Sequence, residues 1–169
     1  MKQTTSYKKS LMILAFSFLA LTGAFAQDAI NKGAWLVGAS SNMGYTSTSV
    51  TGGGSSSSFD MQVGGGYFFM DNLVGGLTFS LSSPSGGTSS TGIGPFARYY
   101  FAGKFYVGAG FVSQSSGGAS TTLIPLEAGV ALFITDNIAV EPGLRYTTYD
   151  GGSQFGIRVG FNLYLNRNK

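Results

Sequence analysis

The last part of the sequence alternates strictly between two kinds of residue. In residues 155–165, FGIRVGFNLYL, every odd position is large and apolar, and the even positions hold Gly, Arg, Asn and Tyr. Successive side chains of a β-strand point to opposite faces, so a period of two predicts a strand with one apolar face. The same alternation recurs in seven more segments: 35–45, 59–67, 73–80, 93–101, 105–114, 124–132 and 138–146.

Two kinds of connection alternate between these eight predicted strands. Short turns lie at Asp71-Asn72, Gly103-Lys104 and Asp136-Asn137. The other connections are longer and rich in Ser, Thr and Gly, at 46–58, 82–90, 115–121 and 147–153. This alternation predicts an up-and-down antiparallel barrel with two different ends. Because eight is an even number, both termini are expected at the short-turn end.

The direction of the apolar face decides the class of barrel. An eight-stranded barrel has an interior just wide enough for side chains to fill it, and eight rows of large apolar side chains would overfill it. Only 10% of the residues are charged, against about 25% in a typical soluble domain. We therefore expect the apolar face to point outward into lipid, where a sheet must close on itself. The sequence predicts an all-β, eight-stranded antiparallel up-and-down transmembrane β-barrel, with a soluble ligand-carrying β-barrel as an alternative.

Aromatic residues gather at both ends of the predicted outward faces. Near the short turns they are Trp35, Tyr67, Phe69, Tyr99, Phe101 and Phe105; at the far ends they are Tyr45, Phe59, Phe79, Phe111, Tyr146 and Phe155. We interpret them as two aromatic girdles, one at each membrane interface. Ten residues of strand, tilted by roughly 40°, rise about 25 Å, which matches the apolar band of such barrels.

The N-terminal segment has the layout of a secretory signal peptide. Lys2, Lys8 and Lys9 precede an apolar run at 11–21, and TGAFA then offers small residues for cleavage before Gln27. Residues 1–26 are therefore predicted to be removed, leaving a single barrel domain at 27–169. Three of the ten basic residues lie in the signal, which leaves seven against seven acidic residues. The balanced charge gives no reason to expect nucleic acid as a partner.

Three segments resemble a known family: GGYFFMDNLVGG, GPFARYYF and LFITDNIAVEPGLRY. They are similar to the outer-membrane β-barrel family common in Bacteroidetes-type bacteria, whose small members include OmpA- and OmpX-like barrels. The resemblance covers nearly all of residues 27–169. It implies a bacterial outer-membrane location, with both termini in the periplasm, and insertion by the barrel-assembly machinery. Many such barrels end on an aromatic residue, whereas Leu165 takes that place here.

The inward faces predict both a register and an ionic cluster. Inward residues must face inward residues across a hairpin, which favours three-residue turns that pair Phe69 with Leu73, Phe101 with Phe105 and Ile134 with Ile138. The third register also places Glu127 opposite Arg145. Buried charges need partners, so we expect an interior ionic plug made of Asp60, Arg98, Glu127, Glu141, Arg145 and Arg158.

No segment carries a recognisable reaction site. The chain has no His and no Cys, which excludes nucleophilic catalysis by a Ser–His or Cys–His pair. Asp71 and Asp136 are explained as turn residues, and Asp150 is a lone carboxylate that cannot form a calcium site. The glycines of 107–110 are not followed by a helix, so a dinucleotide site is not expected. We therefore predict no enzyme activity, no cofactor and no metal.

The expected role follows from a filled barrel in lipid. We predict a monomer in contact with outer-membrane lipid, with a structural or surface-interaction role and an extracellular partner that the sequence does not identify. The alternative within the same fold is a narrow porin-like channel for small solutes.

Overall fold

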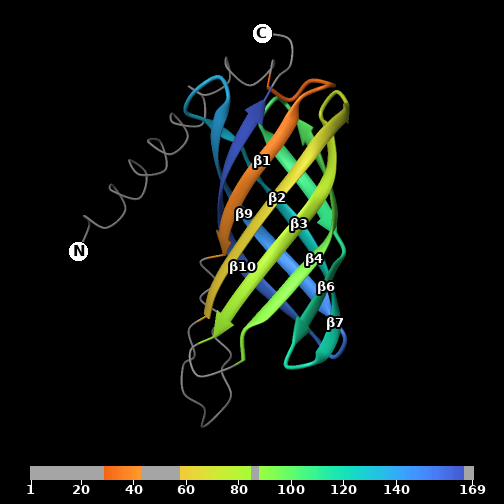
Figure 1. Cartoon of the computed structure of the whole chain (residues 1–169). Coiled ribbons are helices and arrows are strands. Elements are labelled where there is room, and N and C mark those ends of the chain that lie inside the picture. The colour runs from red at the N-terminus through yellow and green to blue at the C-terminus, as the bar shows by residue number, and fades with distance from the viewer. Residues whose placement is uncertain (1–28, 43–57, 85–87, 166–169) are drawn as a thin grey trace, which may run out of the picture.

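The computed structural model describes residues 29–42, 58–84 and 88–165 (Figure 1). The predicted signal peptide and most of the predicted loop 46–58 lie outside these residues. The strands in the described part are β1 (Trp35–Asn42), β2 (Ser58–Met70), β3 (Leu73–Pro84), β4 (Ser90–Phe101), β5 (Phe105–Gly110), β6 (Val112–Ser116), β7 (Ala119–Val130), β8 (Leu132–Phe133), β9 (Ile138–Tyr149) and β10 (Gly152–Leu165). No helix in these residues is long and apolar enough to cross a membrane.

These ten strands form eight continuous runs. β5 and β6 are separated only at Phe111, and both pair with β4 and β7. β7 and β8 are separated only at Ala131, and both pair with β9. Each interruption leaves the register unchanged, so each pair of short strands acts as one. The prediction of eight antiparallel strands in up-and-down order is confirmed.

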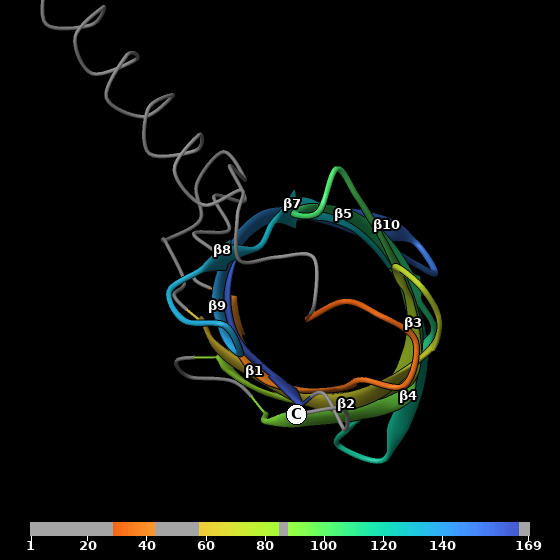
Figure 2. The ribbon, with the colours of Figure 1, turned by 90° about the horizontal axis from the view of Figure 1, so that it is seen from above.

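The sheet closes on itself through its first and last strands. β1 pairs with β10, and Trp35 lies opposite Leu165. The two ends of the described chain therefore meet at the same end of the barrel. Figure 2 shows the strands as a ring around a central axis. Over the described pairs, from Trp35–Leu165 to Ser41–Val159, this closure removes the two free edges of the sheet, as a sheet surrounded by lipid requires.

The pairing around the ring also fixes how steeply the strands are inclined. Starting at Leu165 and moving from each strand to its paired neighbour, the path returns to β10 at Phe155. One circuit therefore shifts the register by ten residues. With a rise of about 3.3 Å per residue and about 4.8 Å between strands, this shift gives a tilt of about 40°. Figure 1 shows the strands running obliquely to the long axis.

The three short turns give one correction to the predicted pairing. At the first turn the predicted pair Phe69–Leu73 is wrong, because Met70 lies opposite Leu73 and the register shifts between Phe68 and Met70. The turn is tighter than expected because Asn72 adopts a left-handed conformation with φ 66°, which Asn tolerates. Beyond the bulge the ladder again pairs inward residues with inward residues.

The other two short turns have the predicted pairing. Phe101 lies opposite Phe105, across a turn in which Ala102 and Gly103 both have positive φ. At the third turn the backbone N–H of Ile134 donates to the carbonyl oxygen of Ile138 at 2.9 Å. These two predictions are confirmed.

At the opposite end two predicted loops are wrong. The strands β6 and β7 are separated only by Gly117-Gly118, and β9 and β10 only by Asp150-Gly151. The Ser- and Thr-rich residues around them belong to strands instead. Ser and Thr are small enough for either setting, and Thr is favoured in strands. The tight hairpins require positive φ, which Gly117, Gly118 and Gly151 supply.

A short segment before β1 closes the turn end of the barrel. Ala29, Ile30 and Ala34 are buried, and in Figure 2 the orange segment starts inside the ring and runs to its wall. The backbone N–H of Asn72 donates to the carbonyl oxygen of Ile30 at 2.9 Å. The backbone N–H of Lys32 donates to Asp71 Oδ1 at 2.8 Å. The segment is thereby tied to the first turn.

Candidate functional site: the barrel interior

The turn end of the interior is filled by aromatic and aliphatic side chains. Those that come from the strands are Leu36, Phe68, Val74, Tyr100, Tyr106, Phe133 and Tyr164, all buried. The Phe68 and Tyr100 rings lie 5.8 Å apart and the Phe133 and Tyr164 rings 5.0 Å apart, between centroids. This layer was not foreseen, although the alternation places Tyr100 and Tyr164 on the inward face. It blocks the barrel at this end together with residues 29–34.

Glycines across the interior make room for these rings. A Cβ atom on Gly129 would lie 2.5 Å from the hydroxyl oxygen of Tyr106, and one on Gly143 would lie 2.8 Å from it. A Cβ on Gly66 would lie 2.8 Å from Val74 Cγ2. Such distances are closer than real Cβ contacts allow. The glycine-rich inward face therefore fits a narrow barrel that holds large side chains at one end.

Glu127 of β7 lies at the centre of an ionic cluster. Its Oε1 accepts hydrogen bonds from Arg98 Nη2 at 2.7 Å and Nε at 2.9 Å. Its Oε2 accepts from Arg145 Nη2 at 3.1 Å and from Arg158 Nη1. The side chains of Glu127 and its three arginine partners are at most 12% exposed. Glu127 also lies opposite Arg145 in the register.

Glu141 of β9 joins the cluster to the aromatic layer. Arg98 Nη1 donates to its Oε2 at 2.7 Å, and the hydroxyl of Tyr164 donates to its Oε1. The guanidinium carbon of Arg98 also lies 4.3 Å from the centre of the Tyr106 ring. Glu141 lies four residues before Arg145 on β9. In the structure its ion-pair partner is Arg98, because both side chains lie nearer the turn end.

Of the six residues expected in the plug, the structure brings five together: Arg98, Glu127, Glu141, Arg145 and Arg158. The side chain of Asp60 lies outside the described part. Gln62 was not foreseen as a member, yet its Oε1 accepts from Arg145 Nη1 at 2.5 Å and its Nε2 donates to Thr78. Its inward position on β2, next to the expected Asp60, was the signal that could have identified it.

The described residues line a larger and a smaller cavity inside the barrel. The larger, about 440 Å³, extends toward the end opposite the short turns. We call it the vestibule. Its inward polar side chains are Gln62, Ser80, Ser82, Gln114, Thr121, Arg145, Thr147 and Gln154. The smaller, about 50 Å³, lies at the ionic cluster and shares Gln62, Pro125 and Arg145 with the vestibule.

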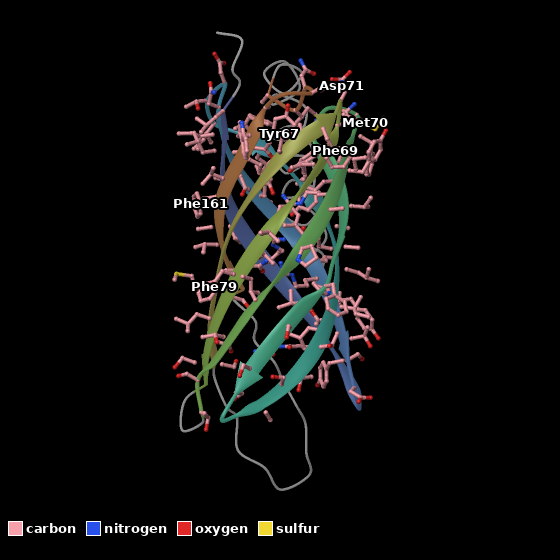
Figure 3. All side chains as sticks on the ribbon, turned by 45° about the vertical axis from the view of Figure 1, so that its right-hand side comes forward. Tyr67, Phe69, Met70, Asp71, Phe79 and Phe161 are labelled. Carbon is pink, nitrogen blue, oxygen red and sulfur yellow. The ribbon has the colours of Figure 1, made fainter. Side chains whose placement is uncertain are left out.

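The outward face is apolar along every strand run. Leu77, Ile93, Ile157 and Phe161 are each about 60% exposed. Nine of the twelve predicted girdle residues are large exposed side chains in the described part: Trp35, Tyr67, Phe69, Tyr99, Phe101, Phe79, Phe111, Tyr146 and Phe155. Phe105 is half-buried, and the side chains of Tyr45 and Phe59 lie outside the described part. In Figure 3, Tyr67 and Phe69 lie near the end that carries Asp71, and Phe79 lies farther toward the opposite end.

Paired charges dominate the middle of the described interior. Within the described residues no group of three or more His, Cys, Asp or Glu side chains is arranged to hold a metal ion. The two carboxylates of the cluster are occupied by arginine and tyrosine donors. The arrangement can therefore fix the shape of the interior and bind small charged species.

Comparison with known proteins supports the architecture. No family model and no curated protein match the sequence. Among solved structures, the N-terminal β-barrel domain of Pseudomonas aeruginosa OprF matches with a TM-score of 0.62 at 16% identity, over 79% of this chain and 98% of that chain. Neisserial surface protein A matches with a TM-score of 0.55 at 19% identity, over 77% and 95%. A de novo designed transmembrane β-barrel matches with a TM-score of 0.51 at 11% identity, over 80% and 98%.

At these identities the likeness concerns the fold. The alignments cover nearly the whole length of the neighbouring chains, so the match includes the complete barrel rather than one hairpin. The chain therefore folds as an eight-stranded, antiparallel up-and-down β-barrel of the transmembrane type.

Proposed function

We propose that the chain is an integral protein of a bacterial outer membrane, with a structural or surface-interaction role and no catalytic activity. The observation that carries this proposal is the apolar exterior of a closed barrel. Burying one large apolar side chain is worth about 1.5–3 kcal/mol, and soluble monomers rarely expose apolar patches larger than a few hundred Å². An exterior with Leu77, Ile157 and Phe161 about 60% exposed favours lipid over a soluble ligand-carrying barrel.

The sequence also supports export of the chain and its insertion into the outer membrane. A signal peptide at 1–26 would deliver the chain to the periplasm. The segments similar to Bacteroidetes-type barrels support insertion by the barrel-assembly machinery. With both ends of the described chain at the short-turn end, that end is assigned to the periplasm and the polar hairpins at Gly117-Gly118 and Asp150-Gly151 to the cell exterior.

A filled interior supports a structural role. The ionic cluster occupies the middle of the barrel, and the aromatic layer with residues 29–34 occupies the turn end. The monomeric barrel would then act as a rigid support for its outer hairpins. A partner at the cell surface would contact those hairpins rather than enter the barrel.

The test is an arginine placed on the outward face at two heights. Val159→Arg lies midway along β10, where Arg in the bilayer costs about 2–4 kcal/mol. Ser153→Arg lies near the outer hairpin of the same strand and face, where the cost is about 0–1 kcal/mol. We expect only Val159→Arg to reduce the folded, outer-membrane fraction, measured as the form that changes electrophoretic mobility on boiling. Equal insertion of both variants would reject the assignment of this face to lipid.

The two adjoining cavities favour a second candidate, a narrow channel for small solutes. The vestibule reaches Arg145 and Gln62, which also line the smaller cavity at the cluster. Conduction would require the ionic cluster and the aromatic layer to rearrange. We expect no steady conductance from the purified protein in planar lipid bilayers. Stable open channels of ion-passing size would favour the channel over the filled barrel.

A further inference from the structure

The exterior of the barrel has a hollow over β1 and β2, about 720 Å³ in volume. Its floor consists of short side chains, because Val37 and Ala39 of β1 lie beside Val63 and Gly65 of β2. Larger apolar side chains form a ridge on each side: Phe161 and Leu163 of β10 with Ile138 of β9, and Leu77 and Phe79 of β3 with Ile93 of β4. The hollow is therefore a groove between two ridges, and it follows the direction of β1 and β2.

Gly65 leaves the floor of this groove bare. Apart from its neighbours in the chain, a Cβ atom on Gly65 would meet only the carbonyl oxygen of Leu36, at 3.7 Å. Gly75, on the outward face of β3, is covered instead, because a Cβ there would lie 2.9 Å from Phe69 Cε1. Of the described side chains, none fills the space over Gly65. Folded proteins are closely packed, so we expect a molecule from the surroundings to occupy the groove.

The lining of the groove selects an apolar occupant. Among the described residues that line it none is charged, and the two polar ones, Thr78 and Asn162, are buried. The groove is continuous with the exposed apolar side chains of Leu77 and Phe161, which a transmembrane barrel presents to lipid. The backbone groups of β1 and β2 are paired within the sheet. A polar ligand would therefore gain no hydrogen bond here.

The turn end of the groove indicates how an apolar chain would lie in it. Trp35 and Tyr67 are paired neighbours, and their ring centroids lie 5.1 Å apart. Each lies two residues from the groove floor, Trp35 before Val37 and Tyr67 after Gly65. Two residues of strand span about 7 Å, so the groove begins just inside the aromatic girdle at the membrane interface. A lipid with a chain in the groove has its headgroup beside this ring pair.

A second copy of the barrel fits this groove poorly. The wall of a closed barrel is convex (Figure 2), so it would rest on the ridges at Phe79 and Phe161 and leave the space over Gly65 empty. In Figure 3 Phe161 lies nearer the turn end than Phe79, so the two ridges are also offset along the barrel. A single hydrocarbon chain is narrow and flexible enough to lie between them.

We propose that the groove binds one acyl chain of a phospholipid from the periplasmic leaflet, with the chain along β1 and β2 and the headgroup beside Trp35 and Tyr67. The site rests on the proposed membrane location and orientation, in which the short-turn end faces the periplasm. Side chains enclose the bound acyl chain on two sides. This phospholipid is therefore held more firmly than lipid that only touches a flat part of the wall.

The first test identifies the lipid that stays bound. The barrel is extracted from outer membranes in mild detergent, its change in electrophoretic mobility on boiling is verified, and its mass is measured with the fold intact. We expect one phospholipid, identified by its mass, on the unmodified chain. Ala39→Leu and Gly65→Leu fill the floor of the groove and are expected to lose it. Ala128→Leu is the matched control, because Ala128 is also exposed but lies on β7, across the ring from β2 (Figure 2).

The outcomes separate the site from the membrane location. No bound phospholipid, or equal retention in the filled and control variants, would overturn the site. A lipopolysaccharide bound in place of the phospholipid, or a dimer that Gly65→Leu disrupts, would overturn it as well. A chain without the form that changes mobility on boiling would instead reject the proposed function.

Trp35 reports the direction of the bound chain, because it is the only Trp in the sequence. The protein is folded into phosphatidylcholine vesicles whose acyl chains carry bromine, which quenches a Trp that it touches, near the headgroup or near the methyl end. We expect stronger quenching by bromine near the headgroup, and part of this quenching should be lost in Gly65→Leu but not in Ala128→Leu. Equal quenching in these two variants would place the chain elsewhere. Stronger quenching by bromine at the methyl end would show that the chain enters from the opposite side of the bilayer, contrary to the proposal.

Discussion

Glu127 accepts hydrogen bonds from the guanidinium groups of three different strands. Removing such a carboxylate leaves several buried cations without their common partner. Continuum calculations and measurements agree that breaking a buried pair on one side is costly, whereas removing both sides is much less so. At the residue scale, the cluster is therefore expected to respond to single changes more strongly than to paired ones.

Glu127→Ala is expected to destabilise the barrel by about 3–5 kcal/mol. The double variant Glu127→Ala with Arg145→Ala should be at least as stable as that single variant, because it removes one of the stranded cations. The measurement is urea unfolding in lipid vesicles. As a control, Lys104→Ala at the second turn is combined with Glu127→Ala. The changes that the two substitutions cause in the free energy of unfolding should add. Full additivity of the Glu127 and Arg145 losses would show that the two do not interact.

The sequence could predict part of this cluster but not its centre. The opposition of Glu127 and Arg145 follows from a hairpin register, because their strands are joined by a turn of known length. Arg98 and Arg158 reach Glu127 from other strands of the ring, and their approach depends on the closure of the barrel and on side-chain rotamers.

At the scale of a strand, the inward glycines differ in what surrounds them. A Cβ on Gly76 of β3 would lie 2.0 Å from the carbonyl oxygen of Gly65 and 2.5 Å from Gly66 Cα. Those are backbone atoms of the paired strand, which cannot move without breaking the ladder. A Cβ on Gly156 of β10 would meet nothing within 4 Å. Both glycines lie within a strand, and the free space around a Cβ differs sharply between them.

Gly76→Ala is therefore expected to destabilise the barrel by about 1–3 kcal/mol, as overpacking typically does. Gly156→Ala serves as the matched control and is expected to be neutral or to stabilise by up to about 1 kcal/mol, because Gly is entropically unfavourable within a strand. Urea unfolding in detergent micelles measures both. A Gly156→Ala variant as unstable as Gly76→Ala would show that free space does not govern the effect.

Strands were predictable to the extent that their residues alternate. The faces of residues 155–165 follow directly from the sequence, since large apolar and small residues take turns. The strand ends in residues 115–121 and 147–153 cannot be located in this way, because Ser and Thr there do not alternate with large apolar residues. Only the glycines at 117, 118 and 151 mark the true turns, and glycine is frequent throughout this chain.

At the scale of the whole molecule, the pairing of β1 with β10 is the contact that makes the sheet a barrel. The chain has no Cys, so a pair introduced across this junction can form only one disulfide. Ala39 lies opposite Phe161, whereas Ile157 is displaced by four residues, about 13 Å along the strand. A disulfide cannot join Cα atoms more than about 7 Å apart without backbone movement.

Ala39→Cys with Phe161→Cys is expected to form a disulfide in the folded protein under mild oxidation. Ala39→Cys with Ile157→Cys is the control and should remain reduced. Non-reducing electrophoresis after boiling distinguishes the two, because the first pair closes a large covalent loop. Cross-linking of the control pair with equal yield would contradict the register of the junction.

The class of fold was predictable from the period of two and the low charge, but the shift of ten residues around the ring was not. Every other neighbouring pair of runs is joined by a connection that limits its register. No such connection joins β1 to β10, so the register of this pair is decided by packing inside the closed barrel. The register at which the barrel closes therefore becomes known only from the three-dimensional structure.

The same junction governs the order in which the molecule can form. Hairpin contacts arise between neighbours in sequence, but the contact between Trp35 and Leu165 joins the two ends of the described chain and carries the largest loop-closure entropy. Non-local pairing of this kind slows folding. Until β10 pairs with β1, the backbone groups on one edge of β1 stay unpaired and can bind a strand of another chain. The pairing of β1 with β10 is thus expected to be the last and slowest step of folding, and the step at which mispairing with another chain is easiest.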